Sequence, residues 1–200
     1  MGLKVYGVSQ SRAFRVLWMV NELGIPFEHV PTHFQTDTKK EDFKKLNPNA
    51  RVPVIDDDGT VVWESMAINL YLAKKYGKDL APGTLVEEAH AMQWSFWVMT
   101  EIEKPLLTAL FASLGMMGSP KDPEKVRVSF EEMRRPLDVL NNHLEGREWL
   151  LDERFTVADL NVASVLFWAT IARLDLSPWP HAKAWLERCL GREAAAKVRK

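Results

Sequence analysis

The chain has 200 residues, 46% hydrophobic and 26% charged, which is typical of a globular protein with room for one or two domains. Its formal net charge of −1 gives no electrostatic reason to expect a nucleic acid or an anionic membrane as a partner. No apolar run reaches the roughly 18 residues of a membrane-spanning helix, and the N-terminus leads into a strand pattern without a signal peptide. We therefore expect a cytoplasmic protein. The single cysteine, Cys189, excludes an internal disulfide and a Cys-x-x-Cys pair, and we expect it to be a buried structural thiol.

The first part of the chain alternates strand and helix patterns. Residues 3–8 predict a strand, and residues 11–23 carry apolar side chains at the spacing of one helix face. Gly24 is placed to end that helix. A second strand is predicted at 27–30 and a short helix at 40–46. This order predicts two parallel strands joined by a helix.

The next stretch predicts a hairpin followed by a helix. Val52-Pro53 ends a loop, a short apolar strand follows, and Asp57-Asp58-Gly59 supplies the turn. The second strand runs over residues 60–63, and Glu64-Ser65 then opens a helix. As purely local features, Ser65 is an N-cap and Glu64 is an acid in the first turn of the helix.

After a turn-rich joint at residues 77–83, no strand pattern recurs. We expect a first domain at 1–77, a linker at 78–86 and an all-helical domain at 87–200. The stretch from residue 87 to about 114 is long for one helix, and Pro105 is expected to bend it without ending it.

A local folding signal lies within the helical part, at residues 155–160. Thr156 is placed to cap a helix, Asp159 to bond back to the amide of the cap, and Phe155 to pack on Leu160. We expect Asp159→Ala to cost about 1–2 kcal/mol of stability through the lost cap.

These motifs resemble the cytosolic glutathione S-transferase superfamily. Val52-Pro53 before one strand and Glu64-Ser65 after the next stand at the spacing of that family, and residues 155–160 and 185–192 are similar to its helical domain. The sequence from Ser9 to Trp18 resembles a theta-like bacterial and fungal type with a serine site. The resemblance implies an α/β thioredoxin-like domain of order βαβαββα, followed by an all-α bundle.

The same resemblance implies how glutathione, the co-substrate, binds. The Val52-Pro53 peptide is expected to be cis, and Val52 to pair with the cysteinyl main chain as a strand would. Glu64 and Ser65 are expected to hold the amino and carboxylate groups of the γ-glutamyl end. Lys40 and Arg51 are candidates for the glycyl carboxylate, and a solvated surface charge explains each equally well.

Three neighbouring residues are candidates for activating the thiol. An ungapped count puts Gln10 where theta-like members carry their serine, with Ser9 and Ser11 on either side. The Ser-Arg-Ala-Phe-Arg sequence resembles a subgroup in which the serine before the arginine recurs. We therefore favour Ser11, with Ser9 as the alternative and Gln10 as a third donor, although helix capping also explains the two serines.

The second substrate is expected to be a small hydrophobic electrophile, bound between the domains near Trp97, Thr108 and Phe111. The five histidines show no metal spacing, and we expect no metal. By resemblance, and from apolar residues at Trp63 and Met66, we also expect a homodimer.

The resemblance implies a transferase that takes part in detoxification by activating the glutathione thiol for attack on electrophiles. The alternatives are a glutathione-dependent disulfide-bond oxidoreductase and a non-catalytic interaction protein with the same fold. The Val52-Pro53 and Glu64-Ser65 pairs argue against the interaction protein, since a scaffold without the ligand does not need them.

Overall fold

The computed structural model describes residues 2–116, 118, 120–151 and 153–199. The chain divides into two compact units. Unit 1 joins Met1–Pro82 to Arg192–Lys200, and unit 2 is Gly83–Gly191. The sequence pattern groups residues 192–200 with the helical part, whereas the contacts of α10 (Glu193–Val198) with α1 (Ala13–Leu23) place this segment in unit 1.

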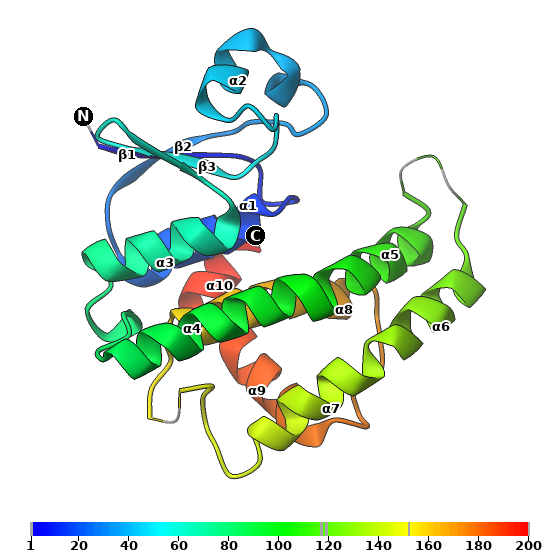
Figure 1. Ribbon diagram of the computed structural model, residues 1–200. Coiled ribbons are helices and arrows are strands. Elements are labelled where there is room, and N and C mark those ends of the chain that lie inside the picture. Colours follow the sequence, from blue (N-terminus) through cyan, green and yellow to red (C-terminus); the bar gives the residue numbers. More distant parts are fainter. Residues whose placement is uncertain (1, 117, 119, 152, 200) are drawn as a thin grey trace. The chain divides into compact units, whose positions relative to one another are not determined.

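Unit 1 is built on a four-stranded sheet of order β2-β1-β3-β4 (Figure 1). The strands are β1 (Leu3–Tyr6), β2 (Phe27–Val30), β3 (Val54–Asp57) and β4 (Thr60–Trp63). β1 pairs parallel with β2 and antiparallel with β3, and β3 and β4 form an antiparallel hairpin. The predicted parallel pair and the predicted hairpin are both confirmed.

Helices cover both faces of this sheet. Figure 1 shows α1 and α3 (Ser65–Tyr76) on one face and α2 (Glu41–Leu46) on the other. Short 3₁₀ turns, η1 (Asp37–Lys39) and η2 (Lys78–Leu80), precede α2 and follow α3. Because side chains alternate along a strand, Tyr6 packs toward Phe43 of α2 while Val5 is buried on the opposite face.

Two turns bring the candidate residues of unit 1 into place. The Val52-Pro53 peptide is cis, as predicted. Asp58 and Gly59 have φ values of 51° and 90°, and the Asp56 carboxylate accepts a hydrogen bond from the Gly59 N–H at 2.8 Å. The predicted hairpin turn is therefore confirmed, and it returns the chain to the start of α3.

The elements of unit 2 are all helices in the part of the chain that the structure describes, as predicted. Its elements are α4 (Leu85–Trp97), η3 (Val98–Ile102), α5 (Glu103–Leu114), α6 (Pro123–Glu132), α7 (Arg134–His143), α8 (Val157–Ile171) and α9 (Pro180–Leu190). The core forms around α8, where a continuous run of 10 residues from Val157 to Leu166 is buried. Cys189 is buried in α9, where the sequence predicted a structural thiol.

The long helical stretch contains an irregularity just before Pro105. The helix continues past Pro105, as predicted, but η3 is a π-helical turn in which the Glu103 N–H donates to the Val98 carbonyl. Proline has no N–H, and its ring crowds the carbonyl four residues earlier, here that of Glu101. The wide turn lies at that carbonyl and absorbs the misfit.

The capping box at the start of α8 is present as predicted. The Thr156 side chain caps the helix, and the Asp159 carboxylate accepts from the Thr156 N–H at 3.0 Å. Asp159 also accepts from the Leu150 N–H at 2.8 Å and from the Trp185 indole N–H at 2.9 Å. The box therefore ties α8 to α9 as well as starting α8.

Over the described ranges, no helix combines the length and the apolar character needed to cross a membrane. The same ranges contain no group of three or more His, Cys, Asp or Glu side chains placed to hold a metal ion.

Candidate functional site

The predicted glutathione-binding residues all belong to unit 1 and come from four loops or helix starts. These are the turn before α1, the start of α2, the loop before β3 and the junction of β4 with α3. They supply, in chain order, Ser9, Gln10, Ser11, Lys40, Arg51, Val52, Pro53, Glu64 and Ser65.

The Ser11 hydroxyl is held at the start of α1 by two hydrogen bonds. It donates to the Val8 carbonyl at 2.7 Å and accepts from the Ala13 N–H at 3.1 Å. A sulfur bound nearby competes with the Val8 carbonyl for the one hydroxyl proton. The Ser9 and Gln10 side chains hydrogen-bond to nothing in the described part of the chain, so either donates without breaking a bond.

The loop before β3 is fixed by a side chain that the sequence reasoning did not single out. The amide of Asn47, which is buried, donates to the Arg51 carbonyl at 2.8 Å, and its oxygen accepts from the Asn49 N–H at 3.0 Å. Asparagine commonly stabilises turns in this way, and this is the only sequence signal for it. The Val52 N–H and C=O pair with no backbone group among the described residues, so this segment can add a strand partner.

The start of α3 combines a strained residue with free helix donors. Glu64 has a φ of 74°, a region that residues other than glycine rarely adopt, and its side chain is exposed. Strain of this kind is often retained at ligand-binding sites. The Glu64 carbonyl accepts the first helical bond, from Ile68, so the Ser65 and Met66 N–H groups have no partner within the helix. An anion is well accommodated there.

Ser65 is linked to a buried arginine that the sequence reasoning missed. The Arg15 guanidinium donates to the Ser65 Oγ at 3.2 Å, with exposed fractions of 1% for Arg15 and 3% for Ser65. On the α1 wheel Arg15 lies opposite the apolar stripe, so helical periodicity predicts it to face solvent. It is buried because α3 packs on α1, and the sequence contains no local sign of that contact.

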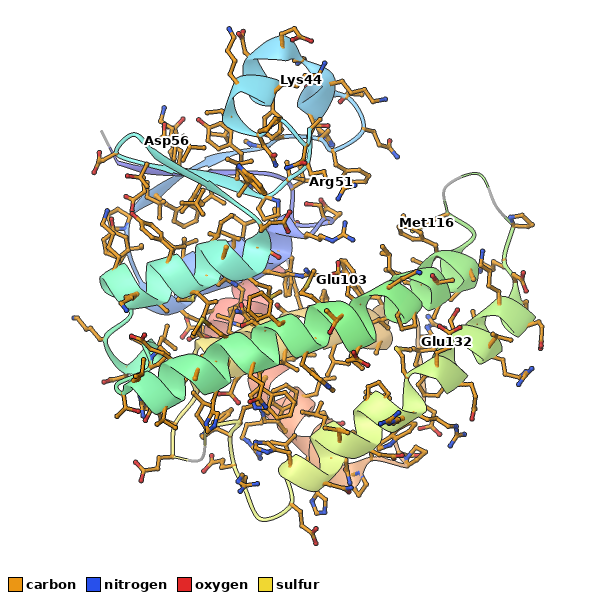
Figure 2. All side chains as sticks on the ribbon, in the orientation of Figure 1. Lys44, Arg51, Asp56, Glu103, Met116 and Glu132 are labelled. Atoms are coloured by element: carbon orange, nitrogen blue, oxygen red, sulfur yellow. The ribbon has the colours of Figure 1, made fainter. Side chains whose placement is uncertain are left out.

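The two candidates for the glycyl carboxylate differ in their surroundings. The Lys40 ammonium pairs with the Asp37 carboxylate at 2.7 Å. The hydrogen bond from Lys40 and one from the His33 N–H hold the pKa of Asp37 below its usual range. Arg51 is exposed in the loop before cis-Pro53, and its side chain has no partner among the described residues (Figure 2). Arg51 is therefore the more available cation.

The three candidates for the electrophile site lie in unit 2, and the structure brings two of them together. Thr108 and Phe111 line a cavity of about 400 Å³ with Met116 and Lys125 among its other residues. Trp97 does not line this cavity. It ends α4 and packs edge-on against Trp94, with ring centroids 5.0 Å apart.

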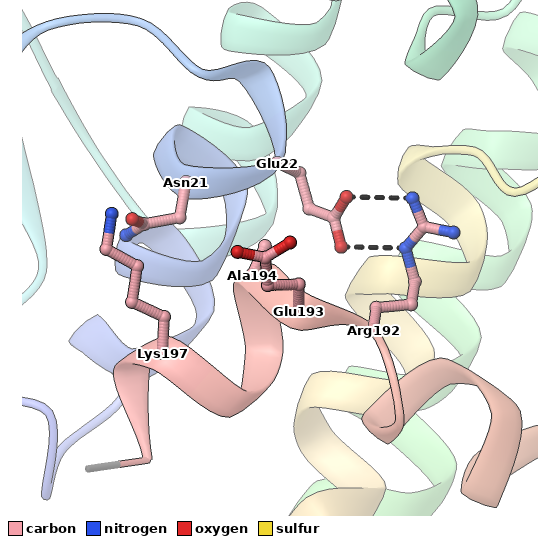
Figure 3. Close-up of a pocket in the computed structure, with 6 residues that line it drawn as sticks. All are labelled: Asn21, Glu22, Arg192, Glu193, Ala194 and Lys197. Atoms are coloured by element: carbon pink, nitrogen blue, oxygen red, sulfur yellow. Dashed lines mark hydrogen bonds and ion pairs between the residues drawn. The ribbon is translucent and has the colours of Figure 1, made fainter.

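A second cavity, of about 460 Å³, lies in unit 1 at the far end of α1 from Ser11 (Figure 3). It is lined by the end of α1 and by α10, and Glu22 forms a two-pronged ion pair with Arg192 at 2.7 and 2.8 Å. Eight helical steps, from Ala13 to Asn21, separate the start of α1 from this cavity, a rise of roughly 12 Å. It therefore lies outside the candidate site, and its ion pair fastens α10 to α1.

The sheet order, the cis-proline loop and the Glu64-Ser65 helix start define a thioredoxin-like domain of the glutathione-binding type. Residues 1–74 match the family described as glutathione S-transferase, N-terminal domain, and residues 90–193 match glutathione S-transferase, C-terminal domain. The chain therefore belongs to the glutathione S-transferase family.

Individual relatives agree with this assignment. The chain is 36% identical to glutathione S-transferase 3 of Zea mays, over 98% of this chain and 92% of that protein. A solved structure of glutathione S-transferase-I bound with lactoylglutathione superposes with a TM-score of 0.88 at 29% identity, covering 99% of this chain and 98% of the other. The chain is also 32% identical to elongation factor 1-gamma of Equus caballus, over 90% of this chain and 42% of that protein.

Proposed function

We propose that this protein is a glutathione S-transferase that activates the glutathione thiol for attack on small electrophiles. The observation that carries the proposal is the pairing, within one unit, of the cis-Pro53 loop with a Glu64-Ser65 helix start whose first N–H groups have no backbone partner among the described residues. A dipeptide-like ligand with a zwitterionic end fits this combination, because the loop offers main-chain pairing and the helix start accepts a carboxylate. Glutathione has both features.

In the proposed complex, each end of glutathione meets a different part of unit 1. Ser65 and the first N–H groups of α3 bind the γ-glutamyl carboxylate, and the exposed Glu64 side chain binds the amino group. The Val52 backbone pairs with the cysteinyl residue, which leaves Arg51 and Lys40 for the glycyl carboxylate. These contacts orient the thiol toward the start of α1.

Activation requires preferential binding of the thiolate. An ordinary thiol has a pKa near 8.5, and lowering it by about two units takes roughly 2.7 kcal/mol. A hydrogen bond from a hydroxyl to an anion supplies about 1.5–3 kcal/mol, and a helix N-terminus supplies up to about 2. Ser11 at the start of α1 provides both, and its oxygen is already polarised by the Ala13 N–H. Ser9 is the alternative donor and Gln10 the third; none of them requires a metal.

The proposed second substrate is a small hydrophobic electrophile. The support for this comes from unit 2, where Thr108 and Phe111 line one cavity whose other residues include both apolar and charged side chains. Conjugation of such compounds would give the protein a role in detoxification. The absence of an internal disulfide is consistent with a cytoplasmic location, and the net charge of −1 favours neither nucleic acid nor membrane as a partner.

A non-catalytic interaction protein is the second candidate, and the similarity to elongation factor 1-gamma favours it. A glutathione-dependent disulfide-bond oxidoreductase is the third, because the same thiolate also attacks a mixed disulfide. Glutathione binding distinguishes an enzyme from the interaction protein. The substrate that is turned over distinguishes the transferase from the oxidoreductase.

Calorimetric titration with glutathione, followed by turnover assays, tests the proposal. We expect binding below millimolar glutathione and faster turnover of an aryl halide than of a mixed disulfide. Absence of binding at millimolar glutathione would favour the interaction protein, and turnover of the disulfide alone would favour the oxidoreductase.

A further inference from the structure

Arg15 and Ser65 form a buried link between the two helices that carry the proposed site. Arg15 lies one turn after Ser11 on α1, and its guanidinium donates to the Ser65 Oγ at 3.2 Å on the first turn of α3. The Arg15 carbonyl accepts a second hydrogen bond, from the Asn69 amide at 3.3 Å, which also crosses from α3 to α1. A charged side chain that is 99% buried is rare unless its charge serves a partner.

The direction of this hydrogen bond determines what Ser65 offers to a ligand. A serine hydroxyl has one proton and two acceptor positions, whereas a guanidinium can only donate. Because Arg15 occupies an acceptor position of the Ser65 oxygen, the Ser65 proton points away from Arg15. Accepting one hydrogen bond also strengthens the hydroxyl as a donor in the next. Ser65 is thus prepared to donate to an anion.

We propose that Arg15 is a positioning residue for the γ-glutamyl carboxylate, because it holds the Ser65 hydroxyl as a donor toward that carboxylate. This inference rests on the proposed function, in which Ser65 binds that carboxylate. The carboxylate carries the same charge before and after the thiol reacts, so Arg15 contributes to binding and leaves the reactivity of the sulfur unchanged.

The test compares two ligands, glutathione and the glutathione analogue in which the γ-glutamyl α-carboxylate is a carboxamide. Calorimetry on the full chain gives the ratio of the two affinities, which a general loosening of the fold does not change. We expect Arg15→Met to lower the preference for glutathione about tenfold, the effect of losing one charge-assisted hydrogen bond. The pKa of the bound thiol is expected to stay at its wild-type value.

Two further variants complete the experiment. Asn69→Ala removes the hydrogen bond from the Asn69 amide to the Arg15 carbonyl, and we expect a lower thermal midpoint with the ligand preference unchanged. In a Ser65→Ala background, adding Arg15→Met is expected to change the preference less than about twofold, because the hydroxyl that Arg15 orients is gone.

Several outcomes would overturn the inference. One is an Arg15→Met variant that prefers glutathione over the carboxamide analogue as strongly as the wild type does. Another is an Asn69→Ala variant that loses as much of this preference as Arg15→Met. The third is a loss of about tenfold when Arg15→Met is added to Ser65→Ala. If Arg15→Met does not fold, Arg15→Gln is measured instead, and an unchanged preference there has the same meaning. Failure of the wild-type protein to bind glutathione at all would instead contradict the proposed function.

Discussion

Ser11 and Ser65 lie at the starts of two helices of unit 1, and in the proposed complex each hydroxyl meets a different part of glutathione. Ser65 meets the γ-glutamyl end, which is unchanged by the reaction, and Ser11 meets the sulfur, which gains charge. Interactions of the first kind affect affinity, and interactions of the second kind affect the population of the thiolate. The two roles can therefore be separated by experiment.

Ser11→Ala should raise the pKa of bound glutathione by about 1–2 units, because it removes a hydrogen bond to a charged group. Affinity for glutathione should stay within a few-fold of wild type, and activity should recover as the pH is raised. The thiolate absorbance of the complex and the pH profile of turnover both measure this.

Three variants serve as controls for the Ser11 experiment. Ser9→Ala and Gln10→Ala should leave the pH profile unchanged, while Ser65→Ala should raise KM and leave the pKa of the bound thiol nearly unchanged. If Ser11→Ala keeps the wild-type profile and Ser9→Ala shifts it, the catalytic serine is Ser9. That result is compatible with the structure, in which the Ser9 hydroxyl has no partner among the described residues.

At the scale of elements, a buried carboxylate joins β3 to α3. The Asp57 side chain accepts hydrogen bonds from Lys75 at 2.7 Å, Tyr71 at 2.8 Å and Tyr76 at 2.9 Å. Burial acts to raise the pKa of Asp57, but the hydrogen bonds from Lys75, Tyr71 and Tyr76 outweigh burial and hold the pKa below its usual 3.8. The ionised carboxylate thus fastens α3 to the sheet.

Asp57→Asn should lower the free energy of unfolding by about 1–3 kcal/mol at pH 7, where the wild-type carboxylate is ionised. A lowered pKa in the folded state contributes stability that is present above pH 3.8 and is lost as the pH falls through the folded value. The difference between variant and wild type should therefore shrink below that pH. Urea unfolding across pH 3–7 measures this difference in the free energy of unfolding.

Asp58→Asn makes the same change at the exposed neighbouring residue and should have little effect on stability at any pH. If both variants lost the same stability over this pH range, the proposed role of Asp57 in holding α3 would be contradicted.

Asp159→Ala should cost more than the 1–2 kcal/mol expected for a helix cap alone. It leaves the Leu150 N–H and the Trp185 indole N–H without an acceptor in the core, so we expect about 3–5 kcal/mol. Asp122→Ala is the matched control, because Asp122 caps α6 with one hydrogen bond to the Lys125 N–H and is exposed. Its cost should be near 1 kcal/mol. Equal losses in denaturant unfolding would show that Asp159 acts as a cap only.

These examples show which elements were predictable. Strands, the hairpin turn, the cis-Pro53 loop and the Thr156 box follow from local patterns or from a resemblance carried by adjacent residues, and all are confirmed. The partners of Asp57 and Asp159 and the burial of Arg15 depend on contacts between elements that no local pattern encodes. The same holds for the π-helical turn, since Pro105 indicates a misfit without indicating where the backbone absorbs it.

At the scale of the whole molecule, unit 2 has an apolar stripe that its own helices do not cover. Leu85, Ala89, Met92 and Phe96 follow one another at helical spacing along α4 and are all exposed, Leu85 by 80% and Phe96 by 68%. Met66, which the sequence suggested for a dimer contact, is instead buried within unit 1. A contiguous apolar stripe that is left exposed typically marks an interface. We propose a second copy of the chain as its partner.

In sedimentation at micromolar concentration, the wild-type protein should have twice the 22.9-kDa mass of the chain. Phe96→Glu should have the mass of a single chain. The charge would have to be buried without a partner at the centre of a dimer contact, which costs several kcal/mol, whereas on a monomer it remains in water. Val139→Glu introduces the same charge at an exposed apolar residue of α7 outside the stripe, and the mass of this variant should stay that of the wild type.

Unchanged secondary structure by circular dichroism would show that Phe96→Glu is still folded. A wild-type protein of single-chain mass would exclude the dimer, and a Phe96→Glu variant that keeps the double mass would move the interface away from α4.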